Sequence, residues 1–439
     1  MSVNGHSRDT LAIRGGRVID ATGERRADVL VGPDGEILDV APELTGDRTL
    51  DAAGCVVSPG FVDLHTHLRQ PGKEEAETIE TGSRGAALGG FTAVVAMPNT
   101  DPPMDCASVV RDVLALAEGA LCEVVPSAAT TVGRKGEALS PMAELVALGV
   151  RLFTDDGTGV QDTRLMRRAL EYASGLTPFA GGASVTIAQH CEVTALSEGG
   201  YMNEGAWSSR LGIPGQPAEA EELMVMRDIA LARLTGARVH FQHLSTAGSV
   251  ELVRRAKAAG LRVTAEATPH HLSLTDACCA SYDPVFKVHP PLRTDADVAA
   301  VRAGLADGTI DAIATDHAPH PQHEKDQPFD LAPPGMLGLE TAFAVARTEL
   351  DLPLAKLLAL LSWQPAAIAQ VDDRHGGPIA PGRRANLCVI DPDTTWVVRG
   401  DAMASRSRNT PFEGRTVRGK VRHTIYDGEV VVLDGEAQR

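Results

Sequence analysis

The stretch that decides the fold is Val56-Val57-Ser58-Pro59-Gly60-Phe61-Val62-Asp63-Leu64-His65-Thr66-His67, an apolar run that ends in two histidines. The run predicts a buried β-strand, and residues two apart on a strand point to the same face. His65 and His67 are therefore placed to hold one metal ion between them. A His-x-His pair at a strand end also occurs in ordinary packing, so the pair alone leaves both interpretations open.

Three further apolar runs end in a histidine or an aspartate. Residues 185–190 end at His190, residues 239–243 at His243, and residues 310–316 at Asp316. Imidazole and carboxylate are the groups from which hydrolytic zinc sites are built. The recurrence at separate strand ends favours a metal site over packing.

The middle of the chain, residues 59–372, alternates β-rich and helical segments, which is typical of βα units around a parallel sheet. Helices are expected at residues 218–235 and 249–259, and the β-rich ends, 1–58 and 373–439, predict small antiparallel sheet. Eight strands close a (β/α)₈ TIM barrel, whose chemistry lies at the carboxyl ends of the strands. The eight candidate strands end near His67, Asn99, Ala129, Asp155, His190, His243, Pro269 and Asp316.

Composition excludes several classes of function. The 439 residues carry a formal net charge of −17, which disfavours nucleic acid as a partner. Seven cysteines without a CxxC pair indicate free thiols in a reducing compartment. The chain shows neither a signal-peptide pattern nor an apolar run of about 18 residues. We expect a soluble, cytoplasmic protein without a membrane partner.

Seven segments together resemble, in order and spacing, the class I dihydroorotases of the amidohydrolase superfamily. The resemblance runs nearly end to end, and it implies that the terminal segments form one composite β-sandwich. The segments are His65-Thr66-His67-Leu68-Arg69-Gln70-Pro71-Gly72, Met97-Pro98-Asn99-Thr100, Phe153-Thr154-Asp155-Asp156-Gly157, Gln189-His190-Cys191-Glu192, His243-Leu244-Ser245-Thr246, Thr268-Pro269-His270-His271 and Ala314-Thr315-Asp316-His317-Ala318-Pro319-His320.

The resemblance implies a binuclear centre with two Zn²⁺ ions. One ion would be bound by His65, His67 and Asp316, and the other by His190 and His243. Asp156 would bridge them, where other members of the superfamily use a carboxylated lysine. Asp316 would also be the catalytic residue that accepts and returns a proton. The absence of cysteine ligands fits Zn²⁺, and the ligand types equally allow Mn²⁺ or Co²⁺.

Substrate contacts are expected around Arg69, whose planar guanidinium suits a carboxylate and which shares strand parity with His67. The alternative for Arg69 is a surface salt bridge. The resemblance adds Asn99 and His320 at that carboxylate, and the residues around Pro334 and Gly335 in the long connection 320–335, which has the character of a lid.

Three positions depart from the family pattern. His289 stands in Lys287-Val288-His289-Pro290-Pro291-Leu292-Arg293, where class I enzymes usually have an asparagine that contacts the pyrimidine ring. Gln70 stands where glutamate is common, and Pro334 where an aromatic residue or methionine often precedes Gly335. His289 is either a tolerated exchange, because Asn and His can both donate one hydrogen bond, or the mark of a shifted substrate.

The activity implied is that of a dihydroorotase, the reversible cyclisation of N-carbamoyl-L-aspartate to L-dihydroorotate by a metal-activated hydroxide in pyrimidine biosynthesis. One alternative is a related cyclic amidohydrolase acting on hydantoin, allantoin or a modified pyrimidine, and Arg69 with Asn99 argues against neutral rings. A remote alternative is a non-catalytic scaffold, although every ligand position is filled. A homo-oligomer is expected, and some relatives dock on an aspartate transcarbamoylase.

Overall fold

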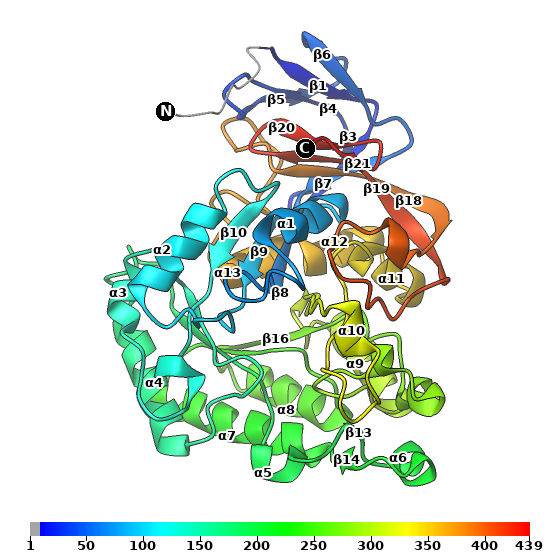
Figure 1. Ribbon diagram of the computed structural model, residues 1–439. Helices are drawn as coiled ribbons and strands as arrows, with labels where there is room; N and C mark the ends of the chain where they lie inside the picture. Colours follow the sequence, from blue (N-terminus) through cyan, green and yellow to red (C-terminus); the bar gives the residue numbers. More distant parts are fainter. Residues whose placement is uncertain (1–8) are drawn as a thin grey trace.

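The computed structural model describes residues 9–439, in which eight parallel strands form a barrel below a β-sandwich (Figure 1). Three strands make one sheet, in the order β10-β9-β8, and five make another, in the order β11-β12-β15-β16-β17. The barrel strands are β8 (Phe61–Thr66), β9 (Phe91–Ala96), β10 (Glu123–Pro126), β11 (Leu152–Phe153), β12 (Thr186–Gln189), β15 (Val239–Phe241), β16 (Val263–Ala267) and β17 (Ala312–Ile313).

Two isolated parallel bridges join these sheets into a closed ring. One pairs Ala128 with Phe153, and the other pairs Thr66 with His317 across the first and last strands. Asp63 strengthens the second junction, because its carboxylate accepts hydrogen bonds from the Thr315 amide (2.8 Å) and hydroxyl (2.6 Å). The predicted TIM barrel is confirmed.

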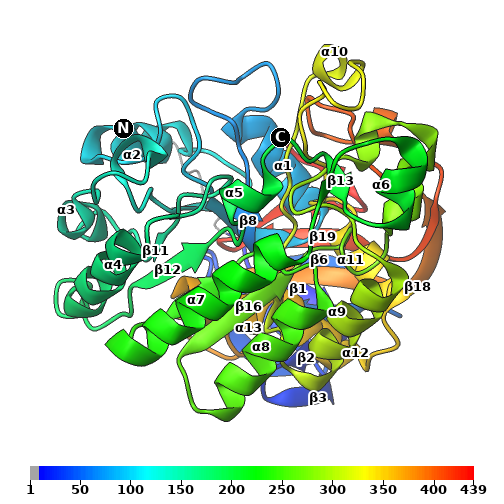
Figure 2. The ribbon, with the colours of Figure 1, turned by 90° about the horizontal axis from the view of Figure 1, so that it is seen from below.

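Helices follow the barrel strands and cover the barrel from outside, with α7 and α8 running side by side across one face (Figure 2). The helices expected at 218–235 and 249–259 are α7 and α8, within two residues at each end. The helices are α1 (Ile79–Leu88), α2 (Ala107–Leu116), α3 (Met142–Val146), α4 (Thr163–Gly175), α7 (Glu219–Thr235), α8 (Ala247–Ala258), α9 (Asp295–Asp307) and α11 (Ala342–Glu349).

Local sequence sets where several of these helices begin. Thr78, Asp162, Thr246 and Thr294 each precede a helix and accept a hydrogen bond from a backbone N–H of its first turn. Such capping satisfies donors that have no partner inside the helix. Of the helices in residues 9–439, none combines the length and apolar character that a bilayer crossing requires.

The chain between the regular units carries several short elements. Between β12 and α7 lie α5 (Thr194–Ser197), β13 (Met202–Asn203), α6 (Ala206–Leu211) and β14 (Gly215–Gln216). The segment after β17 contains α10 (Gln322–Lys325), and α12 (Leu354–Leu361) and α13 (Trp363–Ala369) follow α11. The 3₁₀ turns are η1 (Val132–Arg134), η2 (Asp276–Ser281), η3 (Pro284–Phe286) and η4 (Gly400–Ala402).

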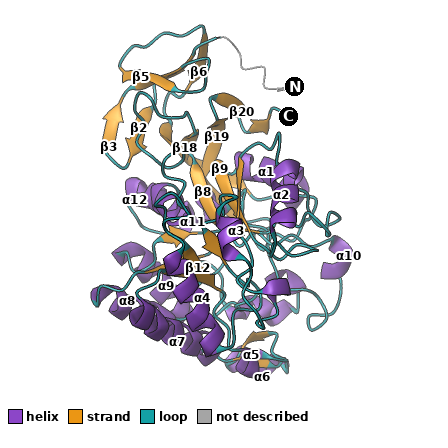
Figure 3. Ribbon diagram, turned by 90° about the vertical axis from the view of Figure 1, so that its left-hand side faces the viewer, coloured by secondary structure: helices purple, strands orange, loops and turns teal. Residues whose placement is uncertain are grey.

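The two ends of the chain share one seven-stranded sheet, in the order β21-β20-β19-β18-β7-β2-β3, and a second sheet has the order β5-β4-β1-β6 (Figure 3). This is the composite sandwich that was expected, and the boundaries at 58/59 and 372/373 stay a prediction. The strands are β1 (Leu11–Arg14), β2 (Arg17–Asp20), β3 (Gly23–Arg26), β4 (Asp28–Val31), β5 (Ile37–Ala41), β6 (Arg48–Asp51), β7 (Val56–Pro59), β18 (Leu387–Val397), β19 (Thr416–Tyr426), β20 (Glu429–Leu433) and β21 (Glu436–Ala437).

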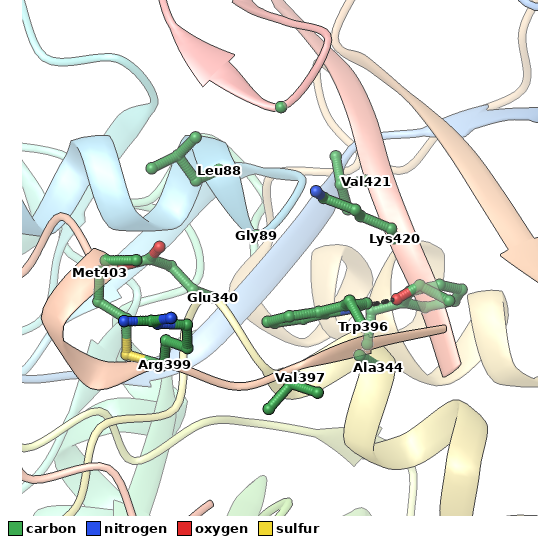
Figure 4. Close-up of a pocket in the computed structure, with 14 residues that line it drawn as sticks. Leu88, Gly89, Glu340, Ala344, Trp396, Val397, Arg399, Met403, Lys420 and Val421 are labelled. Atoms are coloured by element: carbon green, nitrogen blue, oxygen red, sulfur yellow. Dashed lines mark hydrogen bonds between the residues drawn. The ribbon is translucent and has the colours of Figure 1, made fainter. Parts of the chain in front are cut away.

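A cavity of about 270 Å³ lies where α1 and α11 meet the long strands β18 and β19 (Figure 4). The Trp396 ring forms one wall, held by a 2.9 Å hydrogen bond from its Nε1 to the Gly419 carbonyl. None of the predicted site residues lines this cavity. The chemistry therefore has to be sought at the other end of the barrel strands.

Candidate metal centre and active site

Six side chains from five strand ends gather at the carboxyl end of the barrel. We call them the His/Asp cluster, and all six are buried: His65, His67, Asp156, His190, His243 and Asp316. Because parallel strands end at the same rim of a barrel, residues far apart in sequence meet there. His65 lies in strand β8, and His67 directly follows the strand. Their side chains lie on the same side, with ring centroids 5.3 Å apart.

Asp156 lies at the centre of the cluster. Its Oδ1 is 3.2 Å from His65 Nε2, 3.6 Å from His190 Nδ1 and 3.8 Å from His243 Nε2, and its Oδ2 is 3.5 Å from His67 Nε2. Two potential metal-binding groups therefore share this one carboxylate, His65-His67-Asp156 and Asp156-His190-His243. The neighbouring Asp155 is occupied differently, because it accepts a 3.0 Å hydrogen bond from the Thr131 amide.

Asp316 completes the His65 and His67 side of the cluster. Its Oδ1 lies 3.1 Å from His67 Nε2 and 3.5 Å from His65 Nε2. Burial alone would raise the pKa of Asp316, but the charge of His65 and the hydrogen bond with His67 outweigh it and lower the pKa below its ordinary value. The carboxylate is thus ionised at neutral pH.

The histidine rings are oriented for a cation by the partners of their other nitrogens. His65 Nδ1 lies 2.9 Å from Glu266 Oε1, and His67 Nδ1 lies 2.8 Å from Asn99 Oδ1. Donation at Nδ1 would leave each Nε2 with a lone pair for a cation, in place of the proton that His67 Nε2 otherwise shares with Asp316. The buried Nε2 of His65 has no hydrogen-bond partner. Acceptors that face one another in this way fit a bound cation between them.

A cavity of about 220 Å³ adjoins the cluster. Of the twelve predicted site residues, eleven line it, and His65 lies beneath them. Besides the other five members of the cluster they are Arg69, Asn99, His289, His320, Pro334 and Gly335. The sequence-predicted residues are therefore brought together in one place, while their individual roles stay predictions.

Arg69 supplies the positive charge of this cavity. It is 8% exposed, and within residues 9–439 its guanidinium forms no ion pair. Its Nε donates to the Pro319 carbonyl at 3.1 Å, and its Nη2 lies 3.3 Å from His320 Nε2. A surface salt bridge is thus the wrong interpretation. Strand parity is also the wrong reason, because β8 ends at Thr66 and Arg69 has left-handed backbone (φ +62°).

Comparisons with known proteins place the chain in a family. It is 48% identical to the dihydroorotase of Streptomyces coelicolor over 434 residues, covering 97% of this chain and 98% of the relative. It is 49% identical to the dihydroorotase of Mycobacterium tuberculosis over 426 residues, covering 94% and 96%. A sequence model of the family described as Dihydro-orotase-like matches residues 54–249. The chain belongs to the dihydroorotase family.

Solved structures agree on the fold of this dihydroorotase-family chain. The L-hydantoinase of Arthrobacter aurescens superimposes with a TM-score of 0.86 at 24% identity, covering 98% of this chain and 97% of that one. The dihydropyrimidinase of Brevibacillus agri gives 0.83 at 22% identity, covering 98% and 96%. These likenesses show the barrel and sandwich alone.

Two of the departures from the dihydroorotase pattern, His289 and Pro334, line the cavity, and His289 does so with a polar side chain. Its Nε2 lies 3.2 Å from the amide nitrogen of Gln216, which also donates to the Gly200 carbonyl. Burial and the positive charges nearby lower the pKa of His289 to about 4. The ring is therefore neutral, and because Nε2 accepts from Gln216, its proton is on Nδ1.

Sequence reasoning missed the residues that support the cluster from below. Glu266, at the end of β16, contacts both His65 and His240. Glu192 Oε2 lies 3.5 Å from His190 Nε2. The signal was present, since Glu192 belongs to the segment that contains His190 and Glu266 lies two residues before the Thr268-Pro269-His270-His271 segment, but neither was given a role.

Proposed function

We propose that this chain is a metal-dependent dihydroorotase that interconverts N-carbamoyl-L-aspartate and L-dihydroorotate. The observation that carries the proposal is the guanidinium of Arg69, which has no ion-pair partner among residues 9–439, in the same small cavity as the His/Asp cluster. A cluster that can hold two cations provides for amide hydrolysis, and the guanidinium provides for a substrate carboxylate. Family membership at 48% identity supports the same reaction.

The donor set supports a binuclear centre. His65, His67 and Asp316 would hold one cation, His190 and His243 the other, and Asp156 would bridge them. Nitrogen and oxygen ligands without thiolate suit Zn²⁺, and they also accept Mn²⁺ or Co²⁺. Bound there, two such cations would supply a water of lowered pKa and a polarised amide carbonyl.

The chain's own residues orient the substrate and move the proton. Arg69 binds the ring carboxylate together with Asn99 and His320, which fixes the amide over the cluster. Asp316 accepts a proton at Oδ2, since Oδ1 is the oxygen that faces His65 and His67, as the tetrahedral intermediate forms, and it returns the proton to the departing ring nitrogen. In the cyclisation direction the same carboxylate takes the proton from the ureido nitrogen.

An assay of purified protein with L-dihydroorotate, hydantoin and allantoin side by side tests the proposal. Turnover of L-dihydroorotate should exceed that of both neutral rings, because only L-dihydroorotate carries the carboxylate that Arg69 binds. Elemental analysis of the same preparation should find close to two divalent metals per chain. Preference for a neutral ring, or less than about one metal, would contradict it.

We also propose a homo-oligomer that forms through α7. The exposed residues of this helix repeat at helical spacing, with Leu223, Met226 and Leu234 exposed by 42%, 50% and 62%. The full set is Glu219, Leu223, Met226, Ala230, Arg233 and Leu234. An antiparallel second copy with its two-fold axis at Met226 would place the acidic Glu219 beside the basic Arg233 and would bring Leu223 near Ala230.

Light scattering of two matched variants tests this contact. Met226→Glu should reduce the molar mass in solution to that of a monomer, because it buries charge at the two-fold axis. Leu116→Glu, at a 43% exposed apolar residue of α2, is the control and should leave the mass unchanged. An unchanged mass for Met226→Glu would contradict the proposal.

The seven free thiols support a cytoplasmic, reducing location for the protein.

A further inference from the structure

The segment after β17 covers the end of the cavity that Arg69 lines, where we propose that the substrate carboxylate binds. It contributes His320, Pro334 and Gly335 to the cavity that adjoins the His/Asp cluster. On its outer side it lines a wider cavity of about 720 Å³, which shares Arg69 and His320 with the inner one. The position of this segment therefore sets the shape of the place where a substrate carboxylate would bind.

Two buried lysines hold this segment by its backbone. Lys325 Nζ donates to the carbonyls of Pro333 (2.9 Å) and Gly335 (3.3 Å). Lys287 Nζ donates to the carbonyls of Asp330 (3.0 Å) and Ala332 (2.7 Å). Four carbonyls within six residues thus turn toward two side-chain amines.

Both amines lie out of solvent without an acidic partner. Lys287 is 3% exposed and Lys325 is 6% exposed, and within residues 9–439 neither forms an ion pair. Lys287 Nζ instead lies over the Tyr201 ring, 4.6 Å from its centroid. Burying a cation without a carboxylate is costly. The contacts with carbonyls and with the Tyr201 ring offset part of this cost, and they tie the backbone of residues 330–335 to the two lysines.

The contacts lead directly to the residues that face the cavity. The two carbonyls held by Lys325 flank Pro334, and the Pro334 carbonyl lies 2.9 Å from His320 Nε2. His320 Nε2 lies 3.3 Å from Arg69 Nη2. The Gly335 amide also donates to the Lys287 carbonyl at 2.9 Å. A displaced 330–335 segment would therefore displace His320 and leave the Arg69 guanidinium less confined.

Close packing limits the positions that residues 330–335 can adopt while they still line the cavity. Gly335 has φ +144°, and a Cβ at this position would come within 2.9 Å of Ala318 atoms and 3.0 Å of the His320 ring. Asn409 fixes the other side, since its Nδ2 donates to the carbonyls of Ala318 (3.0 Å) and Gly335 (3.1 Å). The lysines close the remaining side.

We infer that Lys287 and Lys325 are positioning residues that clamp the 330–335 segment and thereby shape the carboxylate-binding end of the cavity. Neither lysine touches the cavity itself. The inference rests on the proposed function for the identity of the substrate. The clamp acts through amine donors, so it requires hydrogen bonds to the four carbonyls and no contact between lysine and substrate.

Replacement of each lysine by methionine, which keeps the length and removes the donors, tests the clamp. In Lys325→Met and Lys287→Met, amide hydrogen exchange across residues 326–336 should accelerate, with bound metal unchanged. KM for L-dihydroorotate should rise about tenfold or more, while kcat changes less. Lys257→Met is the control, because Lys257 also donates to a carbonyl, that of Gly308, and pairs with Asp311 just before β17, at the end of the barrel opposite the cavity.

Lys325→Gln keeps a shorter donor and should recover part of the effect. Unchanged exchange across 326–336 in both methionine variants would overturn the clamp, and so would a fall in kcat as large as the rise in KM. If wild-type protein fails to turn over L-dihydroorotate, the proposed function fails, whereas the exchange measurement still decides whether the lysines order the segment.

Discussion

Glu266 Oε1 lies 2.9 Å from His65 Nδ1 at the base of the His/Asp cluster, and Glu266 Oε2 lies 2.9 Å from His240 Nε2. Although burial raises the pKa of Glu266, the hydrogen bonds from His240 and His65 lower it to about 2. The charged carboxylate therefore fixes which nitrogen of His65 faces the cation site, and it makes that nitrogen a better ligand.

Glu266→Gln should weaken metal binding because the amide keeps the shape of the side chain and removes its charge. We expect the affinity for Zn²⁺ to fall about tenfold or more, measured by competition with a chromogenic chelator. Glu340→Gln, which changes a carboxyl outside the cluster, is the control. Equal affinities for the two variants would show that Glu266 does not tune His65.

Asp316→Asn should lower kcat for L-dihydroorotate by at least ~10²-fold, because proton transfer takes place in the transition state. Metal content has to be measured in the same preparation. Two retained metals with the loss in kcat assign the loss to proton transfer. A variant with full activity and full metal content would remove Asp316 from the proposed mechanism.

Sequence patterns predicted the cluster and not its support, for a physical reason. Histidines such as His190 and His243 stand at strand ends, where a polar residue after an apolar run is conspicuous. Asp63 and Glu266 lie inside strands, and their burial is balanced in part by Thr315 and His65, which come from distant parts of the chain. Pairings of that kind are properties of the closed barrel.

The contacts that hold the 320–335 connection could not be predicted from the sequence pattern either. The 320–335 connection has the composition of a lid, yet its ordering depends on backbone carbonyls that turn toward Lys287 and Lys325. Carbonyl directions follow from the conformation of the chain and leave no mark in residue type. Arg69 was expected in the site from strand parity with His67, and it does line the cavity, but parity is not the reason, because β8 ends at Thr66 and the backbone of Arg69 is left-handed.

The pair of Glu123 and Arg374 predicts how stability depends on pH. Arg374 Nη2 lies 2.6 Å from Glu123 Oε1 and links the C-terminal segment to strand β10. Burial would raise the pKa of Glu123, but hydrogen bonds from His375 and Arg374 lower it to about 2. A depressed carboxyl pKa stabilises the fold above the unfolded value of about 4.5, and this contribution is lost as pH falls toward 2.

Glu123→Gln should therefore lower the free energy of unfolding at pH 7 by about 1–3 kcal/mol. Denaturant titrations should show the difference from wild type shrinking between pH 5 and pH 3. Glu429→Gln, at a more exposed carboxylate whose ion pair spans 3.6 Å, is the control. A difference that stays constant over this range would mean that the pair does not set the pKa.

Arg69→Met should weaken binding of L-dihydroorotate by about 2 kcal/mol or more, because it removes a charge-assisted anchor from a buried site. The measure is KM for L-dihydroorotate beside that for hydantoin, which lacks the carboxylate. Hydantoin turnover should change much less. Equal losses on both substrates would make Arg69 structural, and the carboxylate argument for the proposed substrate would fail with it.

His289→Asn decides between a tolerated exchange and a shifted substrate. The neutral ring offers one donor, Nδ1–H, and an asparagine amide also offers a donor, so kcat/KM for L-dihydroorotate should stay within about threefold of wild type. His289→Leu removes the donor and should lower kcat/KM about tenfold or more, since a polar group of the substrate is left unpaired. A large loss in His289→Asn together with a gain on hydantoin would indicate that the imidazole serves another ring. Unchanged values for both variants on every substrate would show that His289 does not contact the ring.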